Sequence, residues 1–329
     1  MARRPRIALA IAGGSLAVWT LVLAGMIAFG TRDPPPPLAS VLNPFERVDF
    51  SDLPKMEAVP ARDGSAIAFR RYAASGSAKP DRMVIAIHGS SATSISFHPF
   101  AKALRAAGLT VYAVDVRGHG GTRQRGDLDH AGQLDDDLTD FVAAVQKQHP
   151  GAKLVLLGFS SGGGYALHAA TLPVAQAFER IVLISPMLGP YAPTIRHGGV
   201  GRWASVFLPR IIALSILDRL GIHAFEHLTT LAFAIDPRRA DILTATYSYR
   251  LMMDFGTMDY AADLRHAKVP LSVLVGDKDE LFDAGQFAPT VHAERPDAVV
   301  TVIPGVNHVG MILDAKAIAA SVAAIGDGS

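Results

Sequence analysis

The sequence predicts an α/β fold in which a mostly parallel sheet is covered by helices on both faces. Continuous apolar runs alternate with helix-forming runs along most of the chain. Runs that are apolar at every position, and not only at alternate positions, are typical of strands buried on both faces. Strands that alternate with helices favour parallel pairing, because a parallel connection needs a crossover that is usually a helix.

The predicted elements follow one another in order. The turn pair Asp63-Gly64 separates two extended runs and predicts a β-hairpin from residue 57 to residue 72. Further strands are expected at residues 83–87, 110–114, 154–157, 181–184, 271–275 and 299–303, and helices at about 96–107, 134–148 and 315–324. The three aspartates at 135–137 suit the positive end of a helix better than they suit a metal ion.

One interval breaks this alternation. Between Ile184 and Leu271 lie more than 80 residues with helical periodicity and no clear strand. An insertion of that size predicts a helical cap at about 186–268 over the carboxyl edge of the sheet, where α/β proteins bind ligands. The apolar runs at 206–217 and 228–235 are expected to be cap helices that also line part of an acyl-chain pocket.

The first 30 residues are predicted to form a separate membrane anchor. Arg3, Arg4 and Arg6 precede an uncharged run of 24 residues from Ile7 to Gly30, which at about 1.5 Å per residue would cross a bilayer core of about 30 Å. The basic flank predicts a cytoplasmic N-terminus and a domain on the far, periplasmic side. The run is longer than the apolar part of a signal peptide, so an uncleaved anchor is favoured over secretion after cleavage.

The segment after the predicted anchor and the overall composition limit what the remaining chain can be. Four consecutive prolines at 34–37 predict a stiff linker over residues 31–44, and the globular domain is expected at 45–329. A formal net charge of +1 gives no reason to expect nucleic acid as a partner. Because cysteine is absent, disulfides, cysteine catalysis and thiolate metal sites are excluded.

The most informative motif is Gly158-Phe159-Ser160-Ser161-Gly162, which reads G-x-S-x-G. It lies between the apolar strand at 154–157 and a helix-forming run. A serine on a sharp strand-to-helix turn is exposed above the sheet as a nucleophile, and the glycines leave room for neighbouring backbone. Ser160 is therefore the predicted nucleophile.

Two later loops offer the partners that a serine nucleophile needs, a base and a carboxylate that orients the base. Asp279 follows the strand at 271–275, and His308 follows the strand at 299–303. Both are expected at the edge of the sheet where Ser160 emerges. Asp277 is the competing carboxylate, and we expect it to fix the turn instead.

Backbone N–H groups are expected to bind the negatively charged oxygen of a tetrahedral intermediate. One donor is predicted at Ser161, directly after the nucleophile. The second is predicted at Ser90, in the loop after the strand at 83–87. His88 precedes it and is expected to have a structural role.

Together these motifs resemble the α/β-hydrolase family over about residues 57–325. The matching segments are His88-Gly89, Asp115–Gly120, Gly158–Gly162, Gly276–Asp279 and Asn307-His308. The Arg-Gly-His-Gly turn at 117–120 and the position of the cap are most similar to the branch of monoacylglycerol lipases, lysophospholipases and serine aminopeptidases. The resemblance implies a sheet of eight strands, a structural role for His119, and the following site: Ser160 as nucleophile, Asp279 as acid, His308 as base, and Ser90 and Ser161 as oxyanion donors.

These expectations predict a membrane-anchored serine hydrolase that cleaves lipid-like or long-acyl carboxylic esters through an acyl-enzyme, without a cofactor. A peptidase of the aminopeptidase type stays open, with Glu226, Asp236 and Asp241 as candidates to bind a substrate amine. A non-catalytic binding protein on the same scaffold also stays open. Residues 223–227 match the zinc pattern H-x-x-E-H, but no third ligand is evident in the cap, so no metal is expected.

Overall fold

An eight-stranded sheet forms the centre of this computed structural model, which describes residues 3–75, 82–122 and 124–326, without the side chains of 3–13, 16 and 200. The strand order is β1-β2-β4-β3-β5-β6-β10-β11. All neighbours pair in parallel except β1 with β2 and β2 with β4, which confirms the mostly parallel, eight-stranded prediction. The strands are β1 Met56–Pro60, β2 Ala66–Tyr72, β3 Arg82–Ile87, β4 Thr110–Val114, β5 Lys153–Phe159, β6 Phe178–Ile184, β10 Leu271–Gly276 and β11 Val299–Ile303.

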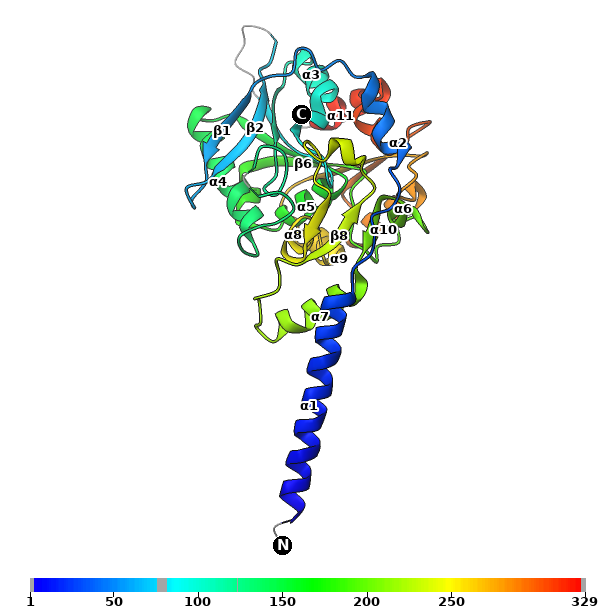
Figure 1. The fold of residues 1–329 in the computed structure, drawn as a ribbon. Helices are drawn as coiled ribbons and strands as arrows, with labels where there is room; N and C mark the ends of the chain where they lie inside the picture. Colours follow the sequence, from blue (N-terminus) through cyan, green and yellow to red (C-terminus); the bar gives the residue numbers. More distant parts are fainter. Residues whose placement is uncertain (1–2, 76–81, 123, 327–329) are drawn as a thin grey trace.

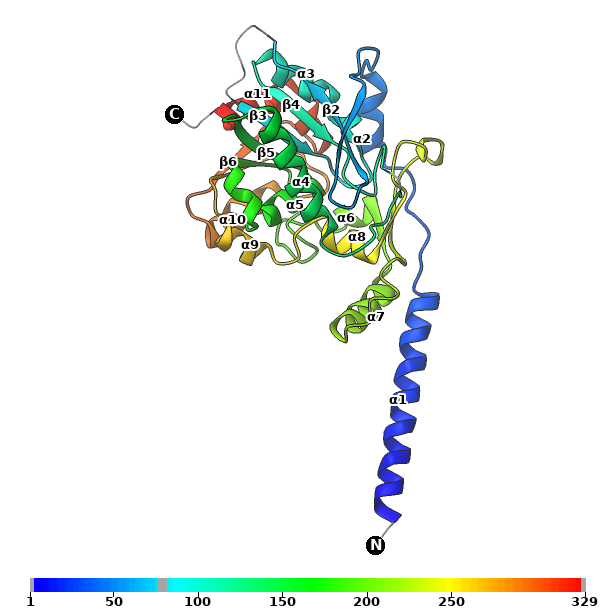
Figure 2. The same cartoon turned by 90° about the vertical axis from the view of Figure 1, so that its left-hand side faces the viewer.

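The apolar runs form strands because the sheet is buried on both faces. In β3, Ile85 and Ile87 pack into one core cluster, whereas Val84 and Ala86 pack into the other. The helices α4 Gln133–Gln148, α5 Ser161–Ala169 and α10 Phe287–Glu294 cover the first face, and α3 His98–Ala106 and α11 Ala315–Gly326 cover the second (Figure 2).

The described residues also form six short 3-10 helices: η1 Asn43–Arg47, η2 Ser94–Phe97, η3 Pro173–Ala177, η4 Pro237–Arg239, η5 Ala284–Gln286 and η6 Val309–Ile312.

The cap lies between β6 and β10, and it is not wholly helical as predicted. Its helices are α6 Gly199–Trp203, α7 Leu208–Arg219, α8 Tyr249–Asp254 and α9 Tyr260–His266. It also contains an antiparallel sheet of the short strands β7 Ala204–Val206, β8 Thr229–Phe233 and β9 Thr246–Ser248. The run at 228–235 was expected to be a helix, but it forms the central strand of this sheet. A short apolar run is compatible with a buried strand or a buried helix. Here hydrogen bonds to β7 and to β9 on the two edges stabilise the strand.

The N-terminal helix α1 Arg3–Phe29 projects away from the globular part and packs against α7 near its C-terminal end (Figure 1). Arg210 joins the two elements to the cap sheet, because its guanidinium donates to the carbonyls of Ile27 and Thr229, each at 2.8 Å. None of the helices is long and apolar enough to cross a membrane, as judged from the residues that the structure describes. The predicted anchor is therefore not supported, although part of the run from Ile7 to Gly30 has side chains outside that description.

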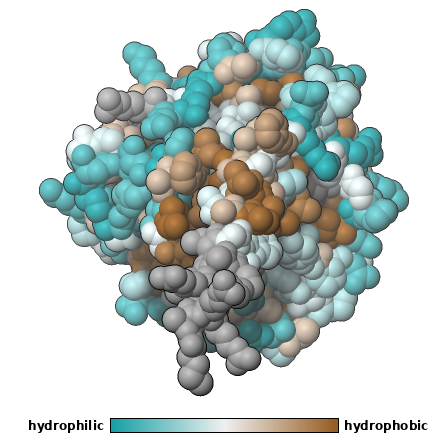
Figure 3. Space-filling model, turned by 60° about the horizontal axis from the view of Figure 1, so that its bottom comes forward, coloured by the Kyte–Doolittle hydropathy of each residue, from teal (hydrophilic) through white to brown (hydrophobic). Residues whose placement is uncertain are grey.

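Apolar side chains gather on the face from which α1 projects (Figure 3). On α7 the exposed ones, Leu208, Ile212 and Ile216, recur every four residues and so lie along one side of the helix. Leu220, directly after the last residue of α7, is exposed as well.

The segment predicted as a proline-rich linker, 31–44, runs along the edge of the cap. The Ser205 hydroxyl donates to the Asp33 carbonyl at 2.6 Å, and the Leu38 amide donates to the Ala234 carbonyl at 3.1 Å. The segment then forms the short helix α2 Ala39–Leu42 and continues into η1. It therefore carries its apolar residues to the carboxyl edge of the main sheet, where it meets the site described next.

Candidate active site

Ser160 occupies a strained turn between β5 and α5. Its φ of 56° and ψ of −120° are in a region that non-glycine residues rarely adopt. The surrounding backbone holds it there: the Ser160 amide donates to the Ile184 carbonyl at 2.9 Å, and the Ser160 carbonyl accepts from the amide of Gly163, also at 2.9 Å. A Cβ atom at Gly162 would overlap the carbonyl oxygens of Ile87 and His88. Glycine at 162 is thus required by close approach of the neighbouring strand.

Three predicted site residues form one continuous hydrogen-bonded chain. His308 Nδ1 lies 2.8 Å from Asp279 Oδ2, and His308 Nε2 lies 3.1 Å from Ser160 Oγ. Since the carboxylate can only accept, Nδ1 carries the proton, and Nε2 is free to accept from the serine hydroxyl. All three side chains belong to buried residues, so bulk water does not compete for these bonds.

The carboxylate of Asp279 is held in its ionised form. Burial alone would raise its pKa, but the charge and hydrogen bond of His308, with the amides of Phe282 and Leu281, lower the pKa below its ordinary value. Both amides donate to Oδ1 at 2.9 Å. Asp279 can therefore stabilise a positive charge on His308 when the imidazole takes a proton.

The competing carboxylate of Asp277 does not contact His308. Its Oδ1 accepts from the Gly305 amide at 2.6 Å, so it joins the loop after β10 to the loop after β11. This is the turn-fixing role expected for it.

The two residues predicted as oxyanion donors lie on either side of the nucleophile. Ser161 is the first residue of α5 and follows Ser160 directly. Ser90 lines the same pocket as Ser160, and the Gly89 before it is so close that an added Cβ would lie 3.1 Å from the Ser160 Cβ.

Residues of the cap fix the loop that carries Ser90, and no sequence motif pointed to them. The Trp203 indole N–H donates to Ser90 Oγ at 2.9 Å. Ser91, with a positive φ of 66°, donates from its amide to the Tyr247 hydroxyl and from its own hydroxyl to the Thr244 carbonyl, both at 2.7 Å. The cap thereby holds a strained residue directly beside the predicted oxyanion donor.

A buried histidine sets the orientation of the Tyr247 hydroxyl. His119 Nδ1 faces the Arg117 carbonyl at 3.3 Å, so it carries the proton, and its Nε2 accepts from the Tyr247 hydroxyl at 2.5 Å. Burial holds the pKa of His119 well below its usual value, so the ring stays neutral. The Tyr247 oxygen is then free to accept from the Ser91 amide. His119 thus supports the loop indirectly.

His88 is likewise enclosed. Its Nε2 accepts from the Val116 amide at 3.1 Å, and its Nδ1 faces the Gly89 carbonyl at 2.8 Å. Burial lowers the pKa of His88, and no nitrogen of the ring is left to act on a substrate. The structural role expected for it fits this geometry.

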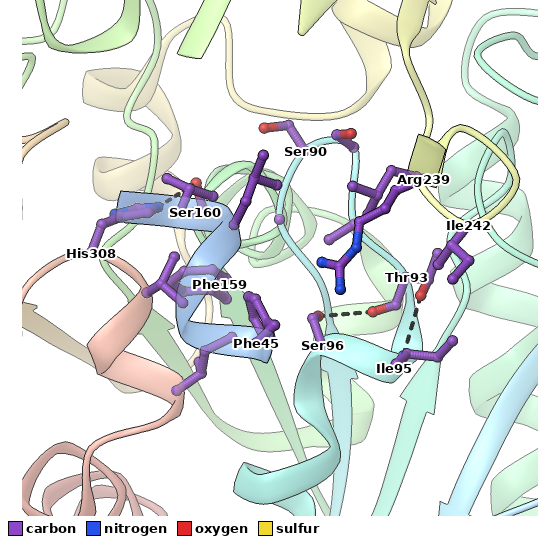
Figure 4. A pocket seen from close by; sticks show the side chains of 18 of the residues that line it. Phe45, Ser90, Thr93, Ile95, Ser96, Phe159, Ser160, Arg239, Ile242 and His308 are labelled. Atoms are coloured by element: carbon purple, nitrogen blue, oxygen red, sulfur yellow. Dashed lines mark hydrogen bonds between the residues drawn. The ribbon is translucent and has the colours of Figure 1, made fainter. Parts of the chain in front are cut away.

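A pocket of about 310 Å³ opens onto Ser160 and His308. Its wall is apolar over most of its extent and comes from three parts of the chain (Figure 4). The N-terminal segment contributes Val41, Leu42, Phe45, Phe50 and Leu53; the cap contributes Trp203, Arg239, Ile242 and Leu243; and the domain built on the main sheet contributes Ile95, Phe159, Leu281, Val309 and Ile312. A pocket of this size and character is typical of a site for a small apolar ligand.

The zinc pattern at 223–227 does not form a metal site of the expected kind. The pattern lies in turns after α7, not on a helix, and His227 is exposed. His223 Nδ1 contacts Glu226 at 2.7 Å and Asp218 at 3.2 Å, and these three could surround an ion. None of them lines the pocket of Ser160.

Comparison with known proteins shows the family to which the chain belongs. A model of the family described as "Serine aminopeptidase, S33" matches residues 78–312. The monoacylglycerol lipase of Mycolicibacterium smegmatis is 28% identical over 255 residues, covering 70% of this chain and 81% of that protein. The monoglyceride lipase of Homo sapiens is 25% identical over 277 residues, covering 80% of this chain and 86% of that protein.

Solved structures agree at the level of the fold. A soluble variant of monoglyceride lipase from Saccharomyces cerevisiae, in complex with a substrate analog, matches with a TM-score of 0.61 and 18% identity. The match covers 83% of this chain and 93% of that one.

We predict that Gly162→Ala destabilises the protein by about 2–3 kcal/mol, because the added methyl overlaps backbone that cannot move aside. Urea denaturation checks the free energy of unfolding. Gly256→Ala is the matched control, since nothing lies within 4 Å of its added Cβ and its φ is ordinary; its stability should stay within about 0.5 kcal/mol of the parent. Equal urea midpoints for Gly162→Ala and Gly256→Ala would contradict the overlap of the added methyl with the backbone of Ile87 and His88.

We predict that Tyr247→Phe lowers kcat for a short-chain ester on the order of 10-fold with little change in KM. The substitution removes the partner of the buried Ser91 amide and lets the oxyanion loop relax. Tyr249→Phe is the control, because its hydroxyl donates to Ser215 in the cap at 3.1 Å and to no residue of the loop that carries Ser90 within the described chain. A Tyr247→Phe enzyme with the parent kcat would show that the loop keeps its geometry without this bond.

Proposed function

Because the chain belongs to the serine aminopeptidase, S33 family, we propose that it is a serine hydrolase that cleaves carboxylic esters of lipid type. The observation that carries the proposal is the chain of hydrogen bonds from Asp279 through His308 to Ser160 at the end of an apolar pocket. Such a chain activates a hydroxyl, and such a pocket accommodates an acyl chain.

In the proposed mechanism, Ser160 Oγ attacks the ester carbonyl as His308 Nε2 takes its proton. Ionised Asp279 stabilises the resulting imidazolium. The amides of Ser90 and Ser161 donate to the oxyanion of the tetrahedral intermediate. His308 then returns the proton to the departing alcohol, which leaves an acyl group on Ser160. A water molecule, deprotonated by His308, releases the acid and restores the serine.

The pocket favours an ester over a peptide as substrate. An aminopeptidase needs a carboxylate that faces the substrate amine, and the described residues that line the pocket include none. Of the earlier candidates, Glu226 pairs with His223 and Asp236 pairs with Arg238. Asp241 does not line the pocket either.

The similar lipases point to the same substrate class. Proteins named monoacylglycerol and monoglyceride lipase align with most of this chain, so we propose a glycerol-type or related lipid ester. The periplasmic location of the domain stays a prediction.

We predict that a fluorophosphonate probe labels the parent protein and that Ser160→Ala abolishes both labelling and hydrolysis of p-nitrophenyl esters. The alanine variant should keep the parent's unfolding midpoint, because the hydroxyl makes a single contact. Ser161→Ala serves as the control, since its predicted role uses the backbone amide alone. Turnover that survives in Ser160→Ala, or preferential hydrolysis of aminoacyl-naphthylamides by the parent, would overturn the ester-hydrolase proposal.

We predict that Phe45→Ala shifts the preference toward longer acyl chains. Figure 4 shows Phe45 beyond Phe159 as seen from Ser160, where an acyl chain would end. Removal of the ring makes room for roughly two further methylenes, each of which contributes about 0.8 kcal/mol when buried. The measurement is kcat/KM over a series of p-nitrophenyl esters. Phe225→Ala, an exposed cap residue outside the pocket, should leave the optimum unchanged; a Phe45→Ala optimum equal to the parent's would remove Phe45 from the acyl site.

A further inference from the structure

One cation lies in the wall of the otherwise apolar pocket. Arg239 is the last residue of η4 in the cap and is half-buried. Its side chain lines the pocket of Ser160. In Figure 4 its guanidinium turns inward, toward Thr93 and Ser96 on the opposite wall, and not outward to solvent.

The guanidinium of Arg239 has no partner in the parts of the chain that the structure describes. No hydrogen bond or ion pair joins its side chain to any residue of 3–75, 82–122 or 124–326, and no described carboxylate lines the pocket. The neighbouring Arg238 behaves in the ordinary way: its exposed guanidinium binds the Asp236 carboxylate at 2.6 Å. The pKa of Asp236 is lowered chiefly by the hydrogen bonds of Arg238 and in smaller part by the charge of Arg239. Of the two adjacent arginines, Arg238 thus forms the ion pair on the surface, whereas the Arg239 side chain lines the pocket with no hydrogen-bonded partner among the described residues.

Arg239 is only half-buried, so solvent still reaches it, but its guanidinium N–H groups have no hydrogen-bond acceptor among the described residues. A ligand with an anionic oxygen group would supply such acceptors, since a guanidinium binds phosphate or carboxylate through two parallel hydrogen bonds. A hydroxyl near the guanidinium can assist. The Thr93 hydroxyl accepts from the Ile95 amide at 3.3 Å, which leaves its own hydrogen for a bound oxygen.

We propose that Arg239 binds an anionic oxygen group of the substrate, so that the preferred esters are anionic amphiphiles and not neutral monoacylglycerols. The inference rests on the proposed ester hydrolysis and names its substrate class. The acyl chain occupies the apolar part of the pocket, and the phosphate or carboxylate lies against Arg239.

The first test compares two esters with the same acyl chain, 1-lauroyl lysophosphatidate and 1-monolauroylglycerol, below their critical micelle concentrations. The full-length enzyme should have the lower KM for the anionic ester. Arg239→Ala and the similarly shaped Arg239→Gln should raise that KM about 10- to 100-fold, the range for a lost hydrogen bond to a charged group. Hydrolysis of monolauroylglycerol should change less than about twofold. Arg238→Ala should change neither ester.

A second pair of esters shows which side of the ester carries the anion. The p-nitrophenyl hemiester of glutaric acid has its carboxylate on the acyl side, and p-nitrophenyl pentanoate is its neutral counterpart. An Arg239-dependent preference for the hemiester supports an acyl-side anion, whereas one for lysophosphatidate supports a head-group phosphate. Equal KM changes for anionic and neutral esters in Arg239→Ala, or none at all, would overturn the inference.

A binding measurement separates this inference from the proposed reaction. Trp203 lines the pocket, so its fluorescence reports dodecyl phosphate binding in Ser160→Ala, with Trp203→Phe as the control for the signal. Binding that weakens about 10-fold or more when Arg239→Gln is added supports the anion site, even if the parent hydrolyses no ester. Equal binding with and without Arg239 would overturn the anion site and would leave the Ser160 mechanism intact.

Discussion

The structure depends on the constrained backbone of Ser160. A serine with a positive φ lies at the end of the central strand β5, and backbone hydrogen bonds from β6 and α5 keep it there. Because β5 lies between β3 and β6, the loop with Ser90 approaches the serine from one side. The loops after β10 and β11, which carry Asp279 and His308, approach from the other side. The strand order thus supplies the candidate nucleophile, its base and an oxyanion loop at one edge of the sheet, and the glycines at 158 and 162 make the close approach possible.

The cap is more than a cover over this edge. Through Trp203, Thr244 and Tyr247 it fixes the conformation of the loop with Ser90, and through Arg239 and Leu243 it lines the pocket. The N-terminal segment is attached to the same unit, since Leu38 bonds to Ala234 and places the apolar residues of α2 and η1 against the pocket. A displacement of the cap would therefore change the pocket and the loop that carries Ser90 together.

The sequence was sufficient to predict those strands and candidate site residues that depend on a short stretch of chain. The strands at 110–114 and 299–303 were predicted at their observed bounds. Every residue of β4 is buried, as expected for an apolar run inside the sheet. The strand β11 is an edge strand with Val299 and Val302 exposed, and there the β-branched residues favour the strand. Ser160, Asp279 and His308 were predicted as site residues because each follows a strand, and their side chains lie in one chain of hydrogen bonds. The strand β8 was missed because a run of five residues has no decisive period. The role of Tyr247 could not be predicted, since its hydroxyl contacts Ser91, which lies 156 residues away in the chain. The role of Phe45 could not be predicted either, because it lines the pocket from just beyond a segment that was predicted to be a linker.

The charge of Arg239 has a consequence for how the pocket would select among esters. Apolar walls bind any acyl chain of suitable length, so they contribute affinity with little discrimination between head groups. A guanidinium without a hydrogen-bonded partner acts differently, because an anionic ester pairs with it and a neutral ester does not. The same residue therefore favours the anionic class of substrate. Arg238 shows that the cap can neutralise an arginine with Asp236 on its own surface, so the absence of such a partner for Arg239 among the described residues is a property of the pocket itself.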